Sequence, residues 1–463
     1  MTHVNQKFLD RVGIRIDLGY QRLLIWELML ERLVLMPLTA KVDHDGHLKI
    51  GDCDTTKLVC EFGTPLYLFD EFTIHTRCRE YREAFSRLYP ESSVIYAGKA
   101  FLNGALVRIL AEEGMGLDVV SCGELGIAQK NGFPAARIYF HGNNKSAEEI
   151  TAALKYRVGH IVVDNTYELE MLERIAAGMG QKQDILLRIS PGVDPHTHRY
   201  ITTGLVDSKF GFTLPEADKA IAWAMGSKHL GLLGLHFHLG SQISETEPYQ
   251  TGIGVALKFA AEMKGKYDFE LKEMNIGGGY AVQYTLDKPV PPITEFIKVI
   301  ASQLVAKCRE LGLNLPYLVT EPGRAIVGQA GVAFYRAGAV KDIPGIRRYV
   351  SVDGGMGDNI RPALYQAVYE AMVANNMLAE PNTKVTIAGK FCESGDILVK
   401  DINLPQISPG DIIALPVSGA YCVPMSSNYN ASFKPAIVMV KDGKARLVRR
   451  RETLVDLTRC DSD

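Results

Sequence analysis

The feature that most constrains the fold is a strand and helix unit that recurs from about residue 90 to residue 325. In each unit a short run rich in Val, Ile and Leu precedes a polar turn. A helical pattern follows most of these runs, which indicates parallel strands with crossover helices. The eight expected strands are Ser93–Ala97, Leu117–Ser121, Ile138–His141, Ile161–Asp164, Ile185–Ile189, Gly234–His238, Glu273–Ile276 and Tyr317–Thr320. Eight such units predict an α/β fold of the (β/α)₈ TIM-barrel type, with its active site at the carboxyl ends of the strands.

An open doubly wound sheet is the alternative, because it uses the same alternation of strands and helices. Helices are expected at Ala147–Tyr156, Tyr167–Ala177 and Glu295–Leu311, and they fit either arrangement. No GxGxxG motif opens a helix after the first strand, which weighs against a dinucleotide-binding sheet. We therefore predict the closed barrel.

The character of the chain changes after Arg324, where short strands are separated by Gly, Pro and Asp turns. Strands are expected at Gly331–Ala337, Arg348–Val352, Val385–Ala388, Asp411–Leu415, Ala436–Lys441 and Ala445–Arg449, with a helix near Leu364–Ala374. Leu48–Ile50 and Thr64–Asp70, which precede the barrel, are expected to complete this region. The sequence thus predicts a barrel over residues 70–325 and a β-rich domain from residues 36–69 plus 326–463.

Residues 1–35 form a separate N-terminal extension in this scheme. The segment Leu23–Leu35 is apolar, but three charges interrupt it, so it is too short and too charged for a membrane span. Acidic residues also argue against a signal peptide. A terminal segment that is not docked is usually tolerant of loss. We expect residues 1–35 to be dispensable and a chain that begins at Met36 to fold.

Charge and cysteine content exclude several classes of partner. The net charge is −2, which gives no electrostatic reason to expect nucleic acid. The eight cysteines form no CxxC pair and no regular framework, so we expect neither a metal site nor a disulfide scaffold. This pattern is typical of a reducing cytoplasm.

Lys99 stands at the end of the first expected strand, where an active site is predicted. A buried ammonium group is costly, and burial lowers its pKa. Such an amine is well suited to forming an imine with an aldehyde. Taken alone, Lys99 is as well explained as a lysine that reaches solvent.

The ends of the sixth and seventh strands carry glycine-rich turns. Gly277-Gly278-Gly279 leaves backbone N–H groups accessible and can form an anion-binding nest. Gly240-Ser241 can add one N–H and one hydroxyl donor. A barrel commonly binds phosphate at the loops after its later strands, so we predict a phosphate site here.

Two further side chains gain significance from Lys99 and the phosphate site. Glu321, after the eighth strand, can pair with a pyridinium nitrogen and keep it protonated. Without that context it is an ordinary partner for Arg324. His238 is either a core histidine or an imidazole that lies against a flat cofactor ring.

Eight short motifs lie between about Gly46 and Met439. They are Gly63-Thr64-Pro65-Leu66-Tyr67, Tyr96-Ala97-x-Lys99-Ala100, Ser208-Lys209-Phe210-Gly211, His236-Phe237-His238-Leu239-Gly240-Ser241-Gln242, Glu321-Pro322-Gly323-Arg324, Arg361-Pro362-x-Leu364-Tyr365, Cys392-Glu393-Ser394-Gly395-Asp396 and Gly419-Ala420-Tyr421. Together they resemble the fold-type-III pyridoxal-phosphate enzymes, which include alanine racemase. Within that group the chain is most similar to the diaminopimelate decarboxylase family.

The resemblance implies pyridoxal phosphate as the cofactor. The residues implied to hold it are Lys99, His238, Ser241, Gly277, Gly278, Gly279, Glu321, Pro322, Gly323, Arg324 and Tyr421. Lys99 would bond to the aldehyde, His238 would stack on the ring and Glu321 would protonate the ring nitrogen. Ser241, the three glycines and Tyr421 would hold the phosphate.

Cys392 is implied to donate the proton that replaces the lost carboxylate, since a thiol pKa can be tuned near neutrality. A cysteine without context is more often a small buried hydrophobe. Its setting in Cys-Glu-Ser-Gly-Asp favours the catalytic role. In the family, Cys392 and Glu393 reach into the neighbouring subunit's barrel, which implies a homodimer with shared active sites.

The implied reaction is decarboxylation of meso-diaminopimelate to L-lysine and CO₂, the last step of lysine biosynthesis. Its substrate carries a second amino acid head group. Arg324 and Arg361 can contact the distal carboxylate in a bidentate manner, and Glu393 can accept from the distal ammonium. Tyr365 and Tyr421 can add hydroxyl groups.

Three other functions stay open at this point. A decarboxylase acting on ornithine, arginine or carboxynorspermidine needs a differently charged or sized distal pocket. A racemase of this fold places an arginine at the pyridine nitrogen, where this chain has Glu321. A non-catalytic pyridoxal-phosphate-binding protein is a single barrel, without the β-rich domain and Cys392.

Overall fold

A computed structural model describes residues 30–193 and 208–462. The chain divides into two compact units. The barrel unit consists of His75–Val282 and Val290–Val327. The β-rich unit consists of the described residues up to Ile74, Gln283–Pro289, and the chain from Gly328 onward.

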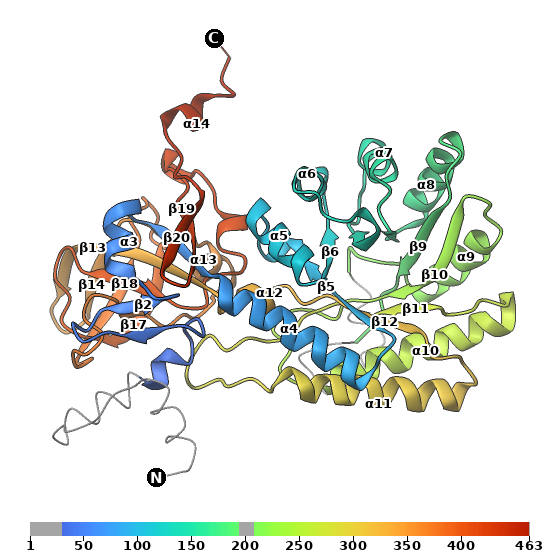
Figure 1. The fold of residues 1–463 in the computed structure, drawn as a ribbon, viewed down its shortest axis with the longest axis horizontal. Helices are drawn as coiled ribbons and strands as arrows, with labels where there is room; N and C mark the ends of the chain where they lie inside the picture. The colour runs from blue at the N-terminus through green and yellow to red at the C-terminus, as the bar shows by residue number, and fades with distance from the viewer. Residues whose placement is uncertain (1–29, 194–207, 463) are drawn as a thin grey trace. The chain divides into compact units, whose positions relative to one another are not determined.

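Eight parallel strands of the barrel unit close into a barrel (Figure 1). They are β5 (Ser92–Ala97), β6 (Gly116–Val119), β7 (Ile138–Phe140), β8 (His160–Val163), β9 (Gln183–Arg188), β10 (Leu230–His236), β11 (Glu273–Asn275) and β12 (Tyr317–Thr320). Pairing of the first strand with the last, Leu318 opposite Ser92, closes the sheet. All eight expected strands are present, and the predicted barrel is confirmed over the open sheet.

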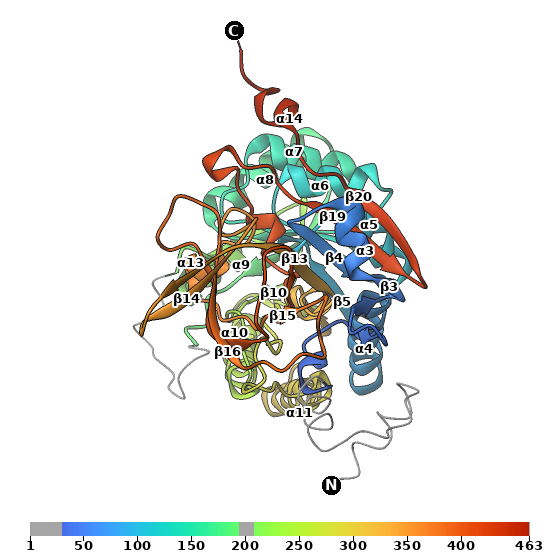
Figure 2. The ribbon, with the colours of Figure 1, turned by 90° about the vertical axis from the view of Figure 1, so that its left-hand side faces the viewer.

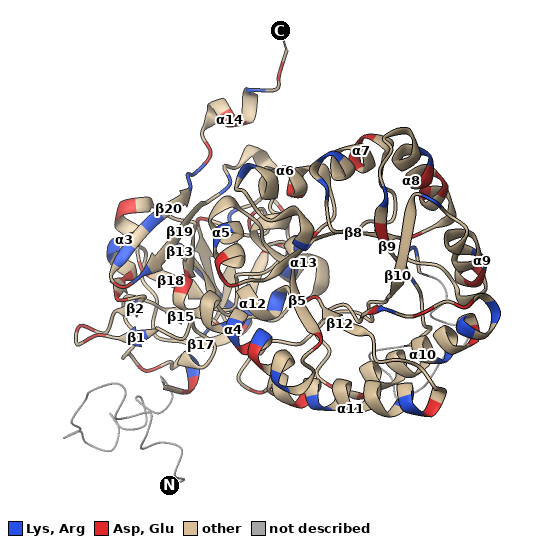
Figure 3. Ribbon diagram, turned by 45° about the vertical axis from the view of Figure 1, so that its right-hand side comes forward, with Lys and Arg blue, Asp and Glu red and all other residues tan. Residues whose placement is uncertain are grey.

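Helices follow the strands and surround the barrel, and charged residues of both signs are spread along them (Figure 3). They are α4 (Glu71–Leu88), α5 (Gly104–Glu112), α6 (Cys122–Lys130), α7 (Ala147–Tyr156), α8 (Thr166–Gly178), α9 (Leu214–Met225), α10 (Glu247–Tyr267), α11 (Ile293–Leu311) and the short α12 (Arg324–Val327). Side chains of Asn103, Ser121, Ser146 and Asn165 accept from the first-turn amides of α5 to α8. These caps fix where each helix begins after its strand.

Inward-facing side chains fill the middle of the barrel. Ile95, Tyr139, Val162, Leu186 and Val319 form one buried cluster. Because successive residues of a strand alternate between its two faces, the neighbours of these residues point toward the helices. The barrel interior is therefore packed, and polar groups are confined to its two ends.

The β-rich unit is built on a nine-stranded sheet, and Figure 2 shows β4 beside β13 and β19. Its strands are β4 (Leu66–Asp70), β13 (Gly331–Ile343), β14 (Arg347–Val352), β15 (Met372–Val373), β16 (Thr383–Ala388), β17 (Ile397–Leu404), β18 (Ile412–Leu415), β19 (Ala436–Lys441) and β20 (Lys444–Arg449). The N-terminal strand β4 thus completes a sheet made mostly of residues after Gly328. Short helices of this unit are α3 (Thr55–Phe62), α13 (Arg361–Tyr365) and α14 (Leu454–Thr458).

Leu48–Ile50 is the strand β2 of this unit, where it pairs with β1 (Lys41–Val42) and β3 (Cys53–Asp54) in a sheet of its own. Two other features of the unit differ from the expectation. The helix expected at Leu364–Ala374 is absent, because the left-handed Gln366 ends α13 after one turn. Further along, residues 371–374 are all buried, which suits the strand β15. Strand β17 was not expected, and its left-handed Asp401 interrupts the alternation that would have indicated it.

The described part of the N-terminal extension packs on the β-rich unit. Leu35 and Met36 are fully buried, and Leu30 and Leu33 pack against the same apolar cluster. The Gln329 side-chain amide donates to the carbonyl oxygens of Val34 and Met36, both at 2.8 Å. Residues 30–35 are therefore part of this unit's core, whereas residues 1–29 lie outside the described residues.

We now expect a chain that begins at Met36 to be less stable than the full chain, contrary to the expectation from sequence. Full burial of a leucine contributes about 1.5–3 kcal/mol, and Leu35 alone reaches that burial. The free energy of unfolding in urea should fall by about that amount or more. A chain that begins at Leu30 is the control and should keep most of the difference. Equal stability of both truncated chains would contradict this packing.

None of the helices within residues 30–193 and 208–462 combines the length and apolar character needed to span a bilayer. All eight cysteines lie in the described chain, and each is a free thiol. None of these eight cysteines is joined to another by a disulfide.

Candidate active site

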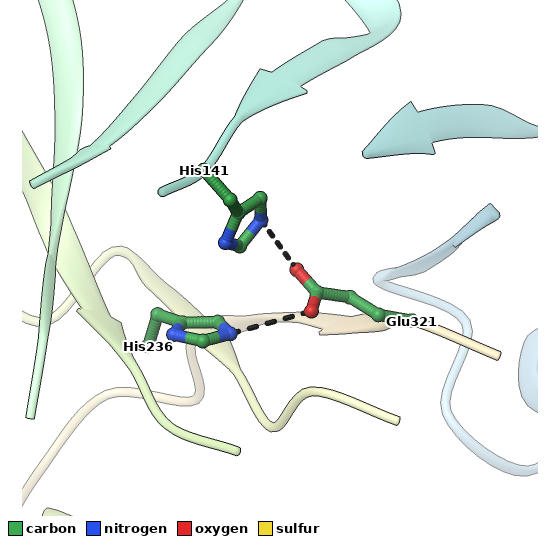
Figure 4. Close-up of side chains that lie close together, drawn as sticks. All are labelled: His141, His236 and Glu321. Carbon is green, nitrogen blue, oxygen red and sulfur yellow. Dashed lines mark hydrogen bonds and ion pairs between the residues drawn. The ribbon is translucent and has the colours of Figure 1, made fainter. Parts of the chain in front are cut away.

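A buried carboxylate lies at the carboxyl end of the barrel strands. Glu321 follows β12, His141 follows β7 and His236 ends β10. His141 Nε2 lies 2.8 Å from Glu321 Oε1, and His236 Nε2 lies 3.3 Å from Oε2 (Figure 4). The side-chain amide of Asn275 donates to Oε1 at 2.8 Å. Three strands thus direct polar groups onto one carboxylate.

The surroundings of Glu321 decide its charge. Burial alone would raise the pKa of this carboxyl, but the two histidines lower it well below its ordinary value. Burial lowers the pKa of His236 to about 4. Glu321 is therefore an ionised carboxylate at neutral pH, held between two imidazole rings.

The sequence did not single out His141, His236 or Asn275 for this role. Each stands at or next to the end of an expected strand, which is the signal that could have identified them. His141, His236 and Glu321 also offer one ligand atom each within 4.8 Å of one another, the spacing of a metal site. Any cation there would compete with the contacts that hold Glu321.

Lys99 lies in a short 3₁₀ turn, Gly98–Ala100, directly after β5. It is exposed, so the expectation of a buried ammonium is wrong, because this turn carries the side chain out of the strand. Its positive charge acts on neighbouring groups of the same barrel end. Burial lowers the pKa of His238 most, and the positive charge of the Lys99 ammonium lowers it further.

His238 lies two residues beyond β10 and is held by the glycine loop. The Gly278 N–H donates to His238 Nδ1 at 3.3 Å. Burial, then the charges of Lys99 and Arg188, keep the pKa of His238 well below its ordinary value. The imidazole is therefore neutral, as a ring that stacks on a flat partner should be.

The three glycines after β11 pack backbone against backbone. A side chain at Gly278 would place its Cβ 2.0 Å from the Glu321 carbonyl oxygen. Gly279 has φ +106°, and its Cβ would lie 2.4 Å from the Gly240 carbonyl oxygen. The loops after β10, β11 and β12 can meet here only because side chains are missing.

Fewer N–H groups of the glycine loop are available to a phosphate than the sequence predicted. The Gly277 N–H donates to Asn275 Oδ1 at 2.9 Å, and that of Gly278 donates to His238. Among the described residues only the Gly279 N–H of the three is left without a hydrogen bond. Beside this loop, Arg324 Nη2 donates to Ser241 Oγ at 3.1 Å, which brings two predicted site residues together.

Five predicted residues belong to the β-rich unit: Arg361, Tyr365, Cys392, Glu393 and Tyr421. Arg361 begins α13, because Pro362 suits the first turn of a helix. Its guanidinium is buried, donates to the hydroxyls of Tyr284 and Tyr369, and lies over both rings, 4.8 and 5.4 Å from their centres. Arg361 is thus held in one orientation. Tyr365, one turn further along α13, is exposed.

Cys392 and Glu393 are exposed at the tip of a loop that Asp396 organises. The buried Asp396 carboxylate accepts from the N–H groups of Phe391 and Met356, at 2.9 and 2.7 Å. The Cys392 N–H donates to Asn430 Oδ1 at 3.1 Å. The motif Cys-Glu-Ser-Gly-Asp therefore presents a thiol and a carboxylate on a fixed loop, with its last residue buried beneath them.

Tyr421, the remaining predicted residue, lies beyond β18 and has a left-handed backbone with φ +61°. Its side chain is half-buried. A non-glycine residue in this conformation is uncommon and is often found at a functional site. The structure therefore gives Tyr421 a defined backbone, whereas its predicted contact with a phosphate stays a prediction.

Comparison with known proteins agrees with this arrangement. Residues 72–328 match the model of the pyridoxal-dependent decarboxylase pyridoxal-binding domain. The chain is 46% identical to diaminopimelate decarboxylase of Bacillus subtilis over 425 residues, 91% of this chain and 97% of that protein. The enzyme of the same name from Synechocystis is 46% identical, with 92% of each chain covered.

Solved structures give the same result. A crystal structure of diaminopimelate decarboxylase from M. jannaschii, in co-complex with L-lysine, has a TM-score of 0.86 and 34% identity, covering 92% of this chain and 98% of that one. The enzyme from Helicobacter pylori, complexed with L-lysine, has a TM-score of 0.79 and 34% identity, covering 88% and 98%. The chain therefore belongs to the diaminopimelate decarboxylase family of pyridoxal-dependent decarboxylases.

Proposed function

We propose that this chain is a carboxy-lyase that converts meso-diaminopimelate to L-lysine and CO₂ with pyridoxal phosphate, the last step of lysine biosynthesis. The observation that carries the proposal is Glu321, an ionised carboxylate buried at the carboxyl end of the barrel. A racemase of this fold has a cation at that place. The names of the relatives support the substrate, and two solved relatives are complexes with L-lysine.

The barrel end fits pyridoxal phosphate in two respects. The glycine loop leaves the Gly279 N–H without a hydrogen bond among the described residues, so this group can donate to a phosphate. Glu321 supplies a carboxylate for a protonated ring nitrogen. The site would be completed by residues that are near these groups in sequence or in space: Lys99, His238, Ser241, Pro322, Gly323 and Arg324. Tyr421 of the β-rich unit would join them.

When bound, pyridoxal phosphate supplies an electron sink for the charge left as CO₂ departs. Around it, Lys99 would bond to the aldehyde carbon through its amine. Neutral His238 would lie against the ring without placing a charge there. Glu321 would hold a proton on the ring nitrogen, because its histidine contacts keep the carboxylate ionised. The Gly279 N–H and the Ser241 hydroxyl would donate to the phosphate.

The β-rich unit would supply the remaining groups. Cys392 would donate a proton to the carbon that loses CO₂, and its exposed position on the loop suits that task. Arg361 donates to the tyrosines through Nη1, so among the described contacts Nη2 and Nε stay available for a distal carboxylate. Glu393, Tyr365 and Tyr421 would contact the distal amino acid group, together with Arg324.

We further propose that the active protein is a homodimer in the cytoplasm. Exposed Cys392 and Glu393 can serve a site on another subunit, which is the arrangement that the family resemblance implies. The presence of eight free thiols, four of them exposed, supports a reducing compartment.

Glu321→Gln should retain cofactor binding and lose most decarboxylation. Glutamine preserves the shape of the side chain, but a neutral amide does not stabilise a protonated ring nitrogen. Removal of one preorganised electrostatic group costs about 10²–10³-fold in turnover, and we expect a kcat loss of that order. Cofactor absorbance and CO₂ release measured on the same sample would test this. Normal turnover would remove Glu321 from the mechanism.

The deciding experiment for the substrate is CO₂ release from a panel of amino acids. Meso-diaminopimelate should be decarboxylated with kcat/KM at least about tenfold above ornithine, arginine and carboxynorspermidine. Conversion of one lysine enantiomer to the other should be absent. Preference for ornithine or arginine would favour the alternative decarboxylase, and no CO₂ release from any of them would favour a binding protein.

A further inference from the structure

A cavity opens at the opposite end of the barrel from Lys99 and Glu321. It measures about 570 Å³ and is lined by residues at the amino ends of the strands. Ser92 begins β5, Gly116 begins β6, His160 begins β8 and Glu273 begins β11. One face of α4 forms its side wall. Nothing in the proposed decarboxylation uses this end of the barrel.

A carboxylate lies buried in the wall of this cavity without its full set of partners. Glu273 is 6% exposed, and its Oε1 has no hydrogen bond to any described residue. Its Oε2 lies 3.5 Å from Nε2 of His160, whose ring stacks on Tyr139. The other ring nitrogen of His160, Nδ1, also has no partner among the described residues. Buried polar groups are usually satisfied, so this pair requires an explanation.

Two arginines of the same cavity have no carboxylate partner. Arg82 donates to the Glu113 carbonyl oxygen and Arg137 to that of Ala111, and neither forms an ion pair with a described residue. Burial lowers the pKa of Arg137 most, and the positive charge of Arg82 lowers it further. The two cations are therefore close enough to repel each other. Arg79 differs, because the Glu113 carboxylate binds it in a bidentate manner.

The cavity wall is therefore divided by charge. Arg82 and Arg137 present two guanidinium groups that lack anions, with exposed Glu83 as the nearest carboxylate in sequence. Glu273 presents an oxygen that lacks a donor. Burial raises the pKa of Glu273 to about 7, although a hydrogen bond with the Tyr139 hydroxyl lowers it. Oε1 still lacks a donor among the described residues, and a donor there would lower this pKa further.

We propose that this cavity binds a small amino carboxylate, whose carboxylate contacts Arg82 and Arg137 and whose ammonium contacts Glu273. An ammonium group both donates a hydrogen bond and compensates a buried carboxylate, whereas a hydroxyl does only the first. A bidentate guanidinium contact suits a carboxylate. The ligand compensates both the two guanidinium groups, which lack an anion among the described residues, and the Glu273 oxygen Oε1, which lacks a donor.

The test uses the cofactor-loaded enzyme and calorimetric titration with amino carboxylates of increasing length: glycine, β-alanine, γ-aminobutyrate and ε-aminocaproate. One length should bind best, because the spacing of the charged groups is fixed. Hexylamine and caproate each lack one end of ε-aminocaproate. We expect each to bind at least about tenfold more weakly than the best amino carboxylate.

Variants assign the binding to this cavity. Glu273→Gln and the double variant Arg82→Ala/Arg137→Ala should each lose at least about tenfold in affinity. Arg82→Lys/Arg137→Lys, which keeps the charge, should lose less. Lys99→Ala should not change the affinity, which separates this cavity from the cofactor end. Failure of all amino carboxylates to bind, unchanged affinity in the cavity variants, or caproate binding as tightly as the best probe would each overturn the proposal.

The stability of the ligand-free protein tests whether the negative charge of Glu273 is uncompensated. Its pKa rises from 4.5 to about 7 on folding, so ionisation opposes folding as the pH rises through that interval. Glu273→Gln should therefore gain in melting temperature over the natural chain, and the gain should be larger at pH 8 than at pH 5. Nearby His160 titrates below this interval, at about 4. A difference that does not grow with pH would mean that the carboxylate is already paired.

Discussion

Lys99→Ala is expected to abolish both the covalent attachment of the cofactor and the decarboxylation. Lys99 follows the first barrel strand directly, and its charge acts on His238 at the same barrel end. Lys99 is the only lysine of the motif Tyr96-Ala97-x-Lys99-Ala100. Loss of a covalent nucleophile costs many orders of magnitude, and we expect turnover to fall about 10⁴-fold or more. The purified variant should also lose the visible absorbance of the bound cofactor.

Two further variants separate the amine from its charge and from its position. Lys99→Arg keeps the positive charge beside His238 but cannot bond to an aldehyde, so it should be as inactive as Lys99→Ala. Lys130→Ala removes an exposed lysine at the end of α6 and should behave as the natural chain. A borohydride-reducible adduct that persists in Lys99→Ala would show that another amine holds the cofactor.

Cys392→Ala is expected to retain the cofactor and to lose about 10²–10⁴-fold in turnover, the usual contribution of a positioned proton donor. The thiol lies exposed on the loop organised by Asp396, so alanine should leave the loop intact. Cys392→Ser, a weaker acid of similar size, should be nearly as slow. Cys60→Ala, another exposed cysteine of the β-rich unit, is the matched control and should keep normal turnover.

Mixing two inactive variants tests whether subunits share their active sites. If Cys392 serves the barrel of another subunit, a heterodimer of Lys99→Ala and Cys392→Ala contains one site with both natural residues. Partial activity should then return after subunit exchange, up to about one quarter of the natural value if chains pair at random. Continued inactivity after demonstrated exchange would mean that Lys99 and Cys392 act within one chain.

The barrel could be predicted from the sequence because its signals are local. Each strand is a short apolar run, and each of α5 to α8 begins at a capping Asn or Ser. Strand ends were therefore placed to within a few residues, and with them Lys99, His238 and Glu321. Position at the carboxyl end of a strand was sufficient to propose these residues for one site.

Partners that are distant in the chain could not be predicted in this way. His141 and Glu321 follow β7 and β12, and these strand ends belong to one site only because β12 pairs with β5 and closes the barrel. The amide of Gly277 was expected to bind phosphate, but Asn275 occupies it. The tyrosines that orient Arg361 come from positions 77 residues before it and 8 residues after it.

The sequence by itself determined the order of strands and helices, the places where they end and the chemical groups at those ends. Periodicity and capping depend on residues that are near one another in the sequence, so they can be recognised without knowledge of the fold. Tertiary structure alone decided which groups meet, and hence that Glu321 is ionised and that Oε1 of Glu273 lacks a donor among the described residues. The physical reason is that burial and pairing set the pKa of a carboxyl, and both are properties of the closed barrel.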